Sequence, residues 1–506
     1  MSSNAVAQSR IAAVVGYLIA KGSFQAVSPN LPQRLAILCE ANTANQGTLD
    51  LTPFQASNAQ QVGARYGYGS PAYLIARILM PLYGGGLDGI PALFYPQAQA
   101  VGATPKSVTI QPAGVATGNA THTVIIGGRN NVDSSFYDIQ IATNDTIATI
   151  TSKITNVVNS VLGSPVTASD NTYINTLTTK WSGATANDLV VSVDTKNNPV
   201  GISYGITTAS AGVGTPSVSP ALALFGADWN TIVINSYGLN TSVMSTLEAF
   251  NGTPDNTNPT GRYQGIVMKP FIALSGSTLA DPSSITDTRL NDVTISVSAA
   301  PNSAAFPFEA AANDALLFAL CAQNTPELDI LNSVYPDMPA ATVIGAMSDY
   351  NNRDLIVKKG CSTVDLSGGL YKVKDPVTTY HPLGENPPQF RYRRDIMVDL
   401  NIRYGYFLLE RQYVLGKVIA NDADIVNTNT VIKPKQWKQI LADYFTQLVQ
   451  RGLIVDANFS LNSLVVNISV ANPNRFETTF NIKRSGVARI SSTTAVMGFN
   501  FGTLNS

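Results

Sequence analysis

The chain is short of charged residues. Only 13% of its 506 residues are charged, and 32 basic against 33 acidic side chains leave a formal net charge of -1. With this balance, neither the basic footprint of a nucleic-acid-binding protein nor a polyanionic tail is visible. Partners must therefore be recognised by shape and by local groups. A surface with so few charges tolerates permanent contact with neighbouring molecules.

Cysteine and long apolar runs are also scarce. Cys39, Cys321 and Cys361 are too few and too far apart for a disulfide framework or a zinc cluster, which predicts reduced thiols in a protein made in the cytoplasm. The apolar run 11–20 is closed at once by Lys21 and has no convincing cleavage site, so it does not predict a signal peptide. Because roughly 20 apolar residues are needed to cross a bilayer, we expect no membrane insertion.

Histidine is the scarcest of the residues that commonly serve catalysis. The chain has two, His122 and His381, and the long interval between them excludes a histidine triad or a multi-histidine metal site within it. Ser275 and Ser277 lie beside glycine but do not form the Gly-x-Ser-x-Gly turn of serine hydrolases. We therefore expect no enzyme activity and no cofactor, with an α/β hydrolase as the weaker alternative.

Two further groups of residues resemble sites. Gly67-Tyr68-Gly69-Ser70 precedes a predicted helix but lacks the lysine of a phosphate-binding loop, so we interpret it as a turn followed by a helix N-cap. Asp281, Asp287 and Asp292 surround Arg289 in a region where α/β sheets usually bind ligands. We favour loop caps and one exposed ion pair over a metal or hydrolytic site there.

Composition and periodicity divide the chain into six segments. The middle of the chain is rich in threonine, with short alternating runs between Gly and Asn turns and one helix that begins near Asp145, which is typical of a separate β-rich domain. The predicted segments are an N-terminal arm (1–25), the N-terminal part of the core (26–100), the inserted β-rich domain (101–217), an α/β domain (218–345), a C-terminal α+β domain (346–484) and a C-terminal arm (485–506).

Alternating strands and helices define the fold class of the segment 218–345. Strands are predicted at 231–235, 265–268 and 293–297, and helices at 242–250 and 308–323. This alternation predicts a parallel, doubly wound α/β sheet. In the C-terminal domain the predicted elements are helices within 391–420 and from Lys433-Pro434 to Gly452, and strands at 464–470 and 476–482.

Both ends of the chain carry strand-like sequence without an adjacent hairpin partner. Unpaired strands present rows of unsatisfied backbone groups, so another chain is expected to complete them. When each copy donates a strand to the next, the contact is heterologous and closes into rings or continues as a helix. The residues expected to make these contacts are Ile11, Val15, Tyr17, Ile19, Ile490, Val496 and Phe499.

Three lysines open the predicted helix at Lys433. Lys433, Lys435 and Lys438 lie on its first turn, where positive charge opposes the helix macrodipole. A local cost of this kind indicates an acidic partner, with ordinary solvation as the simpler explanation.

Four stretches resemble the contractile tail sheath proteins of myophages, especially the Mu-like branch. Each is a loose pattern alone, but their order and spacing carry the likeness over most of the chain outside 101–217. They are FQAVSPNLPQRLAILCEAN (24–42), YGYGSPA (66–72), LNDVTISVSAA (290–300) and RFETTFNIKRSG (475–486).

The resemblance implies a particle-forming structural protein. Its α/β domain is expected to have a subtilisin-like sheet without the catalytic residues, and copies are expected to form stacked hexameric rings around a tail tube. Contraction, triggered at the baseplate, would drive the tube through the host envelope. The implied partners are further copies, the tube, baseplate and tail terminator proteins, in a virion tail assembled in the host cytoplasm. The lysines above are candidates for facing the tube, and a secreted β-rich adhesin is the alternative.

Overall fold

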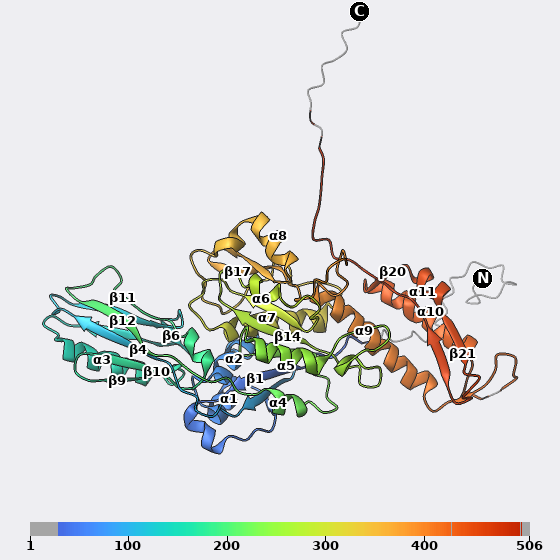
Figure 1. Cartoon of the computed structure of the whole chain (residues 1–506), viewed down its shortest axis with the longest axis horizontal. Coiled ribbons are helices and arrows are strands. Elements are labelled where there is room, and N and C mark those ends of the chain that lie inside the picture. Colours follow the sequence, from blue (N-terminus) through green and yellow to red (C-terminus); the bar gives the residue numbers. More distant parts are fainter. Residues whose placement is uncertain (1–28, 427, 496, 498–506) are drawn as a thin grey trace, which may run out of the picture. The chain divides into compact units, whose positions relative to one another are not determined.

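The computed structural model describes residues 29–426, 428–495 and 497, and the chain separates into two compact units (Figure 1). One, here called the C-terminal unit, contains Gly405–Ile482. The other, here called the body, contains Asn30–Tyr404 and the segment that begins at Lys483. The chain therefore leaves the body within a helix and returns to it at Lys483.

A six-stranded sheet forms the centre of the body. Its strand order is β15-β14-β13-β1-β3-β2, and every neighbouring pair is parallel except β2 with β3. The central strands β1 and β3 are buried along their whole length, as uninterrupted apolar runs in a parallel sheet require. The strands are β1 (Leu35–Glu40), β2 (Phe54–Ala56), β3 (Ala92–Gln97), β13 (Ile232–Asn235), β14 (Ile272–Ser277) and β15 (Ile295–Ala299).

Helices cover both faces of this sheet. Alternate residues of β1 enter different cores: Ile37 packs with α2 and α7, and Leu38 packs with α4 and α5. The helix α2 begins where the sequence predicted, because the Ser70 hydroxyl accepts the Tyr73 N–H at 3.1 Å and Pro71 occupies the first turn. The helices are α1 (Ala59–Tyr66), α2 (Pro71–Leu79), α4 (Ser219–Ala223), α5 (Thr241–Asn251) and α7 (Pro307–Asn324). The body is thus a mixed α/β structure.

Residues 107–210 form three further antiparallel sheets within the body. One has the order β12-β4-β10-β9, the second has the order β11-β5-β8, and the third is the β6–β7 pair. The predicted helix near Asp145 is confirmed as α3, which buries Ile150, Ile154 and Val158. The elements are β4 (Ser107–Ala113), β5 (Ala120–Ile126), β6 (Asn131–Val132), β7 (Ser135–Phe136), β8 (Asp138–Ile141), α3 (Ile147–Ser160), β9 (Val166–Asp170), β10 (Asn175–Thr179), β11 (Val191–Asp194) and β12 (Ser203–Ser210).

The rest of the body consists of short elements, and the long helix α9 begins in it. They are α6 (Ser283–Thr286), α8 (Tyr350–Lys358), β16 (Thr363–Ser367), β17 (Leu370–Asp375), α9 (Arg393–Leu409) and β23 (Lys483–Arg484), with 3-10 turns η1 (Thr43–Thr48), η2 (Ala184–Asp188), η3 (Gly261–Tyr263) and η4 (Gly345–Ser348).

The C-terminal unit is built on one amphipathic helix, α10. This helix buries Trp437, Leu441, Tyr444, Phe445 and Leu448 on one face, as an amphipathic helix does. Its elements are a π-helical turn η5 (Glu410–Val414), β18 (Val418–Ile419), β19 (Val431–Ile432), α10 (Pro434–Gln450), β20 (Ile454–Val455), α11 (Ala457–Ser463), β21 (Val465–Ile468) and β22 (Phe476–Thr479).

One predicted strand is wrong, and one predicted helix is present but shorter than its predicted range. The strand expected at 265–268 is an exposed turn, in which Met268 has a left-handed φ of 34°, and the strand forms instead at β14. The turn is held by Arg262, whose Nε donates to the Lys269 carbonyl at 2.8 Å, a contact that apolar periodicity does not encode. The helix expected over 391–420 ends earlier, because η5 follows α9 and Gly416 adopts a φ of 78°.

Candidate functional site

The carboxyl edge of the six-stranded sheet is the usual ligand position in α/β folds, and here the chain covers it with its own residues. Glu40 at the end of β1 accepts the Thr185 hydroxyl at 2.5 Å, and Thr185 accepts the Trp181 indole N–H at 3.0 Å. Both Glu40 and Trp181 are buried. Burial raises the pKa of Glu40 to about 7, and the Thr185 hydrogen bond lowers it by less. At the end of β1 this edge is therefore a buried joint with residues 181–185.

The serines and histidines considered for hydrolysis have other partners. Ser275 accepts the Asn235 side-chain amide at 2.9 Å, and the Ser277 hydroxyl accepts the Leu279 N–H at 3.3 Å. His122 lies 2.7 Å from the Tyr204 hydroxyl, within the strands of residues 107–210. His381 Nδ1 lies 2.6 Å from the Thr379 carbonyl. Among the contacts of the described residues, none joins a histidine to Ser275 or Ser277, so no nucleophile–base pair is assembled there.

The acidic residues around Arg289 form ion pairs and a loop cap. Arg289 pairs with Asp292 at 2.7 Å and with Glu248 at 2.6 Å, and its side chain is buried, where an exposed pair was expected. Asp281 accepts the Ser283 N–H at 2.9 Å as a loop cap. Asp287 lies 3.3 Å from the Lys359 ammonium and 3.5 Å from His381 Nε2. Within the described ranges, no group of three or more His, Cys, Asp or Glu residues is arranged to hold a metal ion.

The glycine motif before α2 serves close packing. Gly69 has a φ of 81°, and a Cβ at this position would lie 1.9 Å from the Ser164 carbonyl oxygen. The motif is thus a turn that lets the segment after α3 approach α2, followed by the Ser70 N-cap.

The three lysines lie at the start of α10, as the sequence predicted. Lys435 and Lys438 are exposed and Lys433 is half-buried. The Lys433 ammonium donates to the Asp424 carbonyl, and the Lys435 N–H donates to the Asp422 carboxylate at 2.9 Å. The Asp422 charge therefore offsets part of the electrostatic cost of placing lysines at the positive end of a helix.

A two-stranded sheet packs on α10 in the C-terminal unit. Val465 pairs with Thr479 and Ile468 with Phe476 in the antiparallel β21–β22 pair. The Trp437 indole N–H donates to the Thr478 hydroxyl at 3.2 Å, which ties the sheet to the helix. Among the described residues no third strand joins this sheet, so each strand has an open edge.

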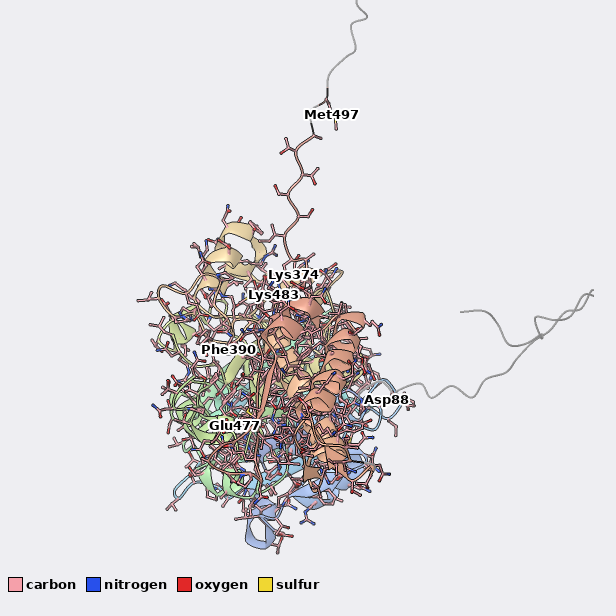
Figure 2. The ribbon with its side chains drawn as sticks, turned by 90° about the vertical axis from the view of Figure 1, so that its right-hand side faces the viewer. Asp88, Lys374, Phe390, Glu477, Lys483 and Met497 are labelled. Atoms are coloured by element: carbon pink, nitrogen blue, oxygen red, sulfur yellow. The ribbon has the colours of Figure 1, made fainter. Side chains whose placement is uncertain are left out.

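The described part of the C-terminal arm projects from the body. No strand follows β23 in residues 485–495, and Ile490 and Met497 are 84% and 90% exposed. Figure 2 shows Met497 far out on an extended segment beyond Lys483. Every side chain from Ile490 to Ser506 is uncharged. The other expected arm residues, Ile11, Val15, Tyr17, Ile19, Val496 and Phe499, lie outside the described residues.

One surface was missed by sequence reasoning. A groove of about 710 Å³ lies among α2, the β6–β7 turn and the loop after α2, and its walls include Tyr68 and Leu316. Leu82, Tyr83 and Leu162 line it and are strongly exposed. Exposed apolar groups around a groove are typical of contact surfaces. The available signal in the sequence is the apolar Leu82-Tyr83 pair directly before three glycines.

Comparison with known proteins identifies relatives of one kind. No protein-family model matches the sequence. The chain is 24% identical over 374 residues to the Mu-like prophage FluMu tail sheath protein of Haemophilus influenzae, covering 72% of this chain and 74% of that protein. This match confirms the resemblance to Mu-like tail sheath proteins.

Two solved structures are similar to the chain. One is the sheath tail protein of Desulfitobacterium hafniense, with a TM-score of 0.44, 12% identity, and coverage of 93% of this chain and 100% of that one. The other is the helical sheath of the anti-feeding prophage in its contracted state, with a TM-score of 0.41, 10% identity, and coverage of 97% and 100%. In the described parts of the chain, no helix is both long and apolar enough to cross a membrane.

Proposed function

We propose that this relative of the Mu-like prophage tail sheath proteins is a structural subunit of a contractile tail sheath. The sequence match over 72% of the chain carries the proposal. Copies assemble as stacked hexameric rings around a tail tube in a virion tail that is built in the host cytoplasm. The sheath contracts when the baseplate releases it and drives the tube through the host envelope. The protein acts by assembly, without catalysis.

The projecting C-terminal arm supports assembly by strand exchange. An extended, uncharged segment with exposed Ile490 is suited to pair with a sheet edge of another copy, because backbone hydrogen bonds then replace contacts with water. Each such bond contributes about 0.5–1.5 kcal/mol net, so a strand of several residues gives a lasting link. The N-terminal residues Ile11, Val15, Tyr17 and Ile19 take the same role at the other end of the chain.

The β21–β22 sheet is the acceptor that the C-terminal unit offers. Both strands have an open edge, and the sheet is fixed on α10 through the Trp437–Thr478 hydrogen bond and the contact of Phe445 with Phe480, whose ring centroids lie 5.2 Å apart. A two-stranded sheet is marginal alone and gains stability from added strands. Donated arms from neighbouring copies therefore complete the sheet and connect the lattice.

The closed carboxyl edge supports a structural role for the α/β sheet. The buried Glu40–Thr185–Trp181 chain occupies the region where a doubly wound sheet would bind a substrate. We assign to this sheet the subtilisin-like, non-catalytic scaffold that the family resemblance implies.

Lys433, Lys435 and Lys438 are proposed to face the tube. Lys435 and Lys438 are exposed, and their ammonium groups can meet acidic residues of a tube protein. Charge reversal in a Lys435→Glu/Lys438→Glu variant is expected to impair assembly on purified tubes. A Lys358→Glu variant changes an exposed lysine of the body and is the matched control. Equal assembly of both variants removes this assignment.

Electron microscopy of the purified full-length protein tests the proposed function. A sheath subunit gives striated hollow polymers, alone or with tubes. A protein that stays monomeric at high concentration in the presence of tubes is not a sheath.

A further inference from the structure

The C-terminal segment is fastened to the body before it projects. We call residues 484–489 the tail root and residues 490–495 with Met497 the projecting tail. Arg484 begins the root: its Nε lies 3.4 Å from the Asp399 carboxylate, and its Nη1 donates to the Gln389 carbonyl at 3.1 Å. Its guanidinium also lies over the Phe390 ring, 5.8 Å from the centroid.

Arg394 holds the next residue of the root. Its guanidinium donates to the Ser485 hydroxyl at 2.7 Å and also to the Ser485 carbonyl. The same guanidinium donates to the Glu327 carbonyl at 2.8 and 3.0 Å. The Arg394 side chain is buried. Since Arg394 belongs to α9, its hydrogen bonds join the root to both α9 and the loop after α7.

Arg489 closes the root. Its guanidinium pairs with the Asp329 carboxylate and stacks on the Tyr392 ring, 3.8 Å from the centroid. The Arg489 side chain is 13% exposed and that of Asp329 is 2% exposed, whereas the next residue, Ile490, is 84% exposed. The chain is therefore held by the body up to Arg489 and is exposed from the next residue, Ile490.

We propose that the tail root is an anchor that passes tension from the projecting tail directly into the body. The inference rests on the proposed sheath function, because tension arises only when another copy holds the tail. Without the anchor, a pull on the tail would reach the C-terminal unit first, since the chain enters the root from Ile482. With it, the pull is taken by Asp329, Tyr392 and Arg394, which belong to the body.

The chemistry of the anchor suits this role. A planar guanidinium can pair with a carboxylate and stack on a ring at the same time, which a lysine ammonium cannot do equally well. Asp329 is also fixed, because its other oxygen accepts the Ile330 N–H at 2.8 Å. Arg489 thus meets a rigid, desolvated partner instead of a flexible surface carboxylate.

Limited trypsin digestion of the full-length protein tests the anchor without assembly. The Asp329→Asn variant keeps the size of the side chain and its hydrogen bond to Ile330 but loses the charge. We expect cleavage after Arg489 to become at least about ten-fold faster, because the open form of the root becomes more populated. Tyr392→Ala is expected to act in the same direction. Tyr392→Phe keeps the ring face and should stay within about two-fold of wild type.

Cleavage after Arg475, which is exposed between β21 and β22, is the internal reference. An unchanged rate there shows that the protease is equally active in both digests, and a urea midpoint close to that of wild type shows that a variant is folded. If wild-type protein is cut after Arg489 as fast as Asp329→Asn, the root is not anchored and the proposal is overturned.

Polymer length tests the transmission of tension. Where wild-type protein forms polymers, those of Asp329→Asn are expected to be several-fold shorter after contraction, while those of Tyr392→Phe keep wild-type length. Equal lengths for Asp329→Asn and wild type overturn the mechanical role. If wild-type protein forms no polymer, the proposed function fails, and the digestion still decides whether the anchor exists.

Discussion

The joint around residues 181–185 and the projecting tail differ in where their large apolar side chains lie: they are buried in the joint and exposed to solvent in the tail. At the joint, Trp181 is fully buried, its ring lies 5.3 Å from that of Phe306, and its N–H reaches Thr185 and through it Glu40. In the tail, Ile490 and Met497 are left in solvent. The contacts of the joint stabilise the single chain, whereas the exposed apolar side chains of the tail are those that we propose for contact with another copy. Substitutions in the two regions should therefore separate folding from assembly.

Trp181→Ala should have the largest effect on folding. It removes a buried indole, the ring contacts with Phe306 and Phe308, and the hydrogen bond to Thr185. We expect the free energy of unfolding to fall by about 3–5 kcal/mol. Urea denaturation measures it, with Tyr83→Ala, a strongly exposed aromatic, as the control near zero. A loss below about 1 kcal/mol would show that the joint is not part of the core.

Glu309→Gln should have the next largest effect. The Glu309 carboxylate lies 3.2 Å from Arg129 and 3.5 Å from Arg77, and it also accepts the Phe306 N–H at 3.1 Å. Neutralising it leaves two poorly solvated guanidinium groups with only Asp337 as a common partner, at a cost of about 3 kcal/mol. Asp354→Asn breaks an exposed pair with Lys358 and serves as the control, with less than about 0.5 kcal/mol expected. Equal midpoints for the two variants would contradict this account.

The dependence of stability on pH sharpens the description of the joint. Burial raises the pKa of Glu40 from 4.5 to about 7, so the folded chain holds this proton more tightly than the unfolded chain. The resulting stabilisation is complete below the unfolded pKa and is lost as the pH rises through about 7, a change of about 3 kcal/mol.

Glu40→Gln isolates this contribution. Burial also raises the pKa of Asp188 to about 6, which acts in the same direction in both proteins, so the difference between wild type and variant reports Glu40. Denaturation at pH 5 and pH 8 should show wild type losing more stability than the variant. Parallel curves would mean that Glu40 titrates as an ordinary carboxylate.

Local patterns were sufficient to predict much of the fold. The Ser70 N-cap of α2, the helix near Asp145 and the helix that begins at Lys433-Pro434 all depend on neighbouring residues, and all are confirmed. The strand expected at 265–268 is wrong, because Ile266 and Val267 lie in an exposed turn held by Arg262. A run of apolar residues alone does not distinguish a buried strand from an exposed turn.

The parts of the candidate surfaces that the sequence could not predict are those that depend on contacts between residues far apart in the chain. Asp329 and Arg489 are 160 residues apart, and no local sequence pattern around either residue predicts their ion pair. The buried Glu40 likewise accepts its hydrogen bond from Thr185, which is 145 residues away. The uncharged character of the arm after Arg489 could be predicted from the sequence, but the residue at which it leaves the body could not, because that point is set by packing against Asp329 and Tyr392.

Truncation after Arg489 should have the smallest effect on folding. It therefore tests whether the projecting tail contributes to assembly and not to folding. The removed segment begins with an exposed isoleucine and includes an exposed methionine, so the free energy of unfolding should change by less than about 0.5 kcal/mol. Sedimentation of the same protein should show loss of polymers, because the segment that we propose to be donated to another copy is gone. An Ile490→Ser variant, which keeps the backbone, should weaken polymers less than truncation does. A truncated chain that polymerises as wild type would place the links between copies elsewhere, and one that unfolds at lower urea would show that the tail packs on its own molecule.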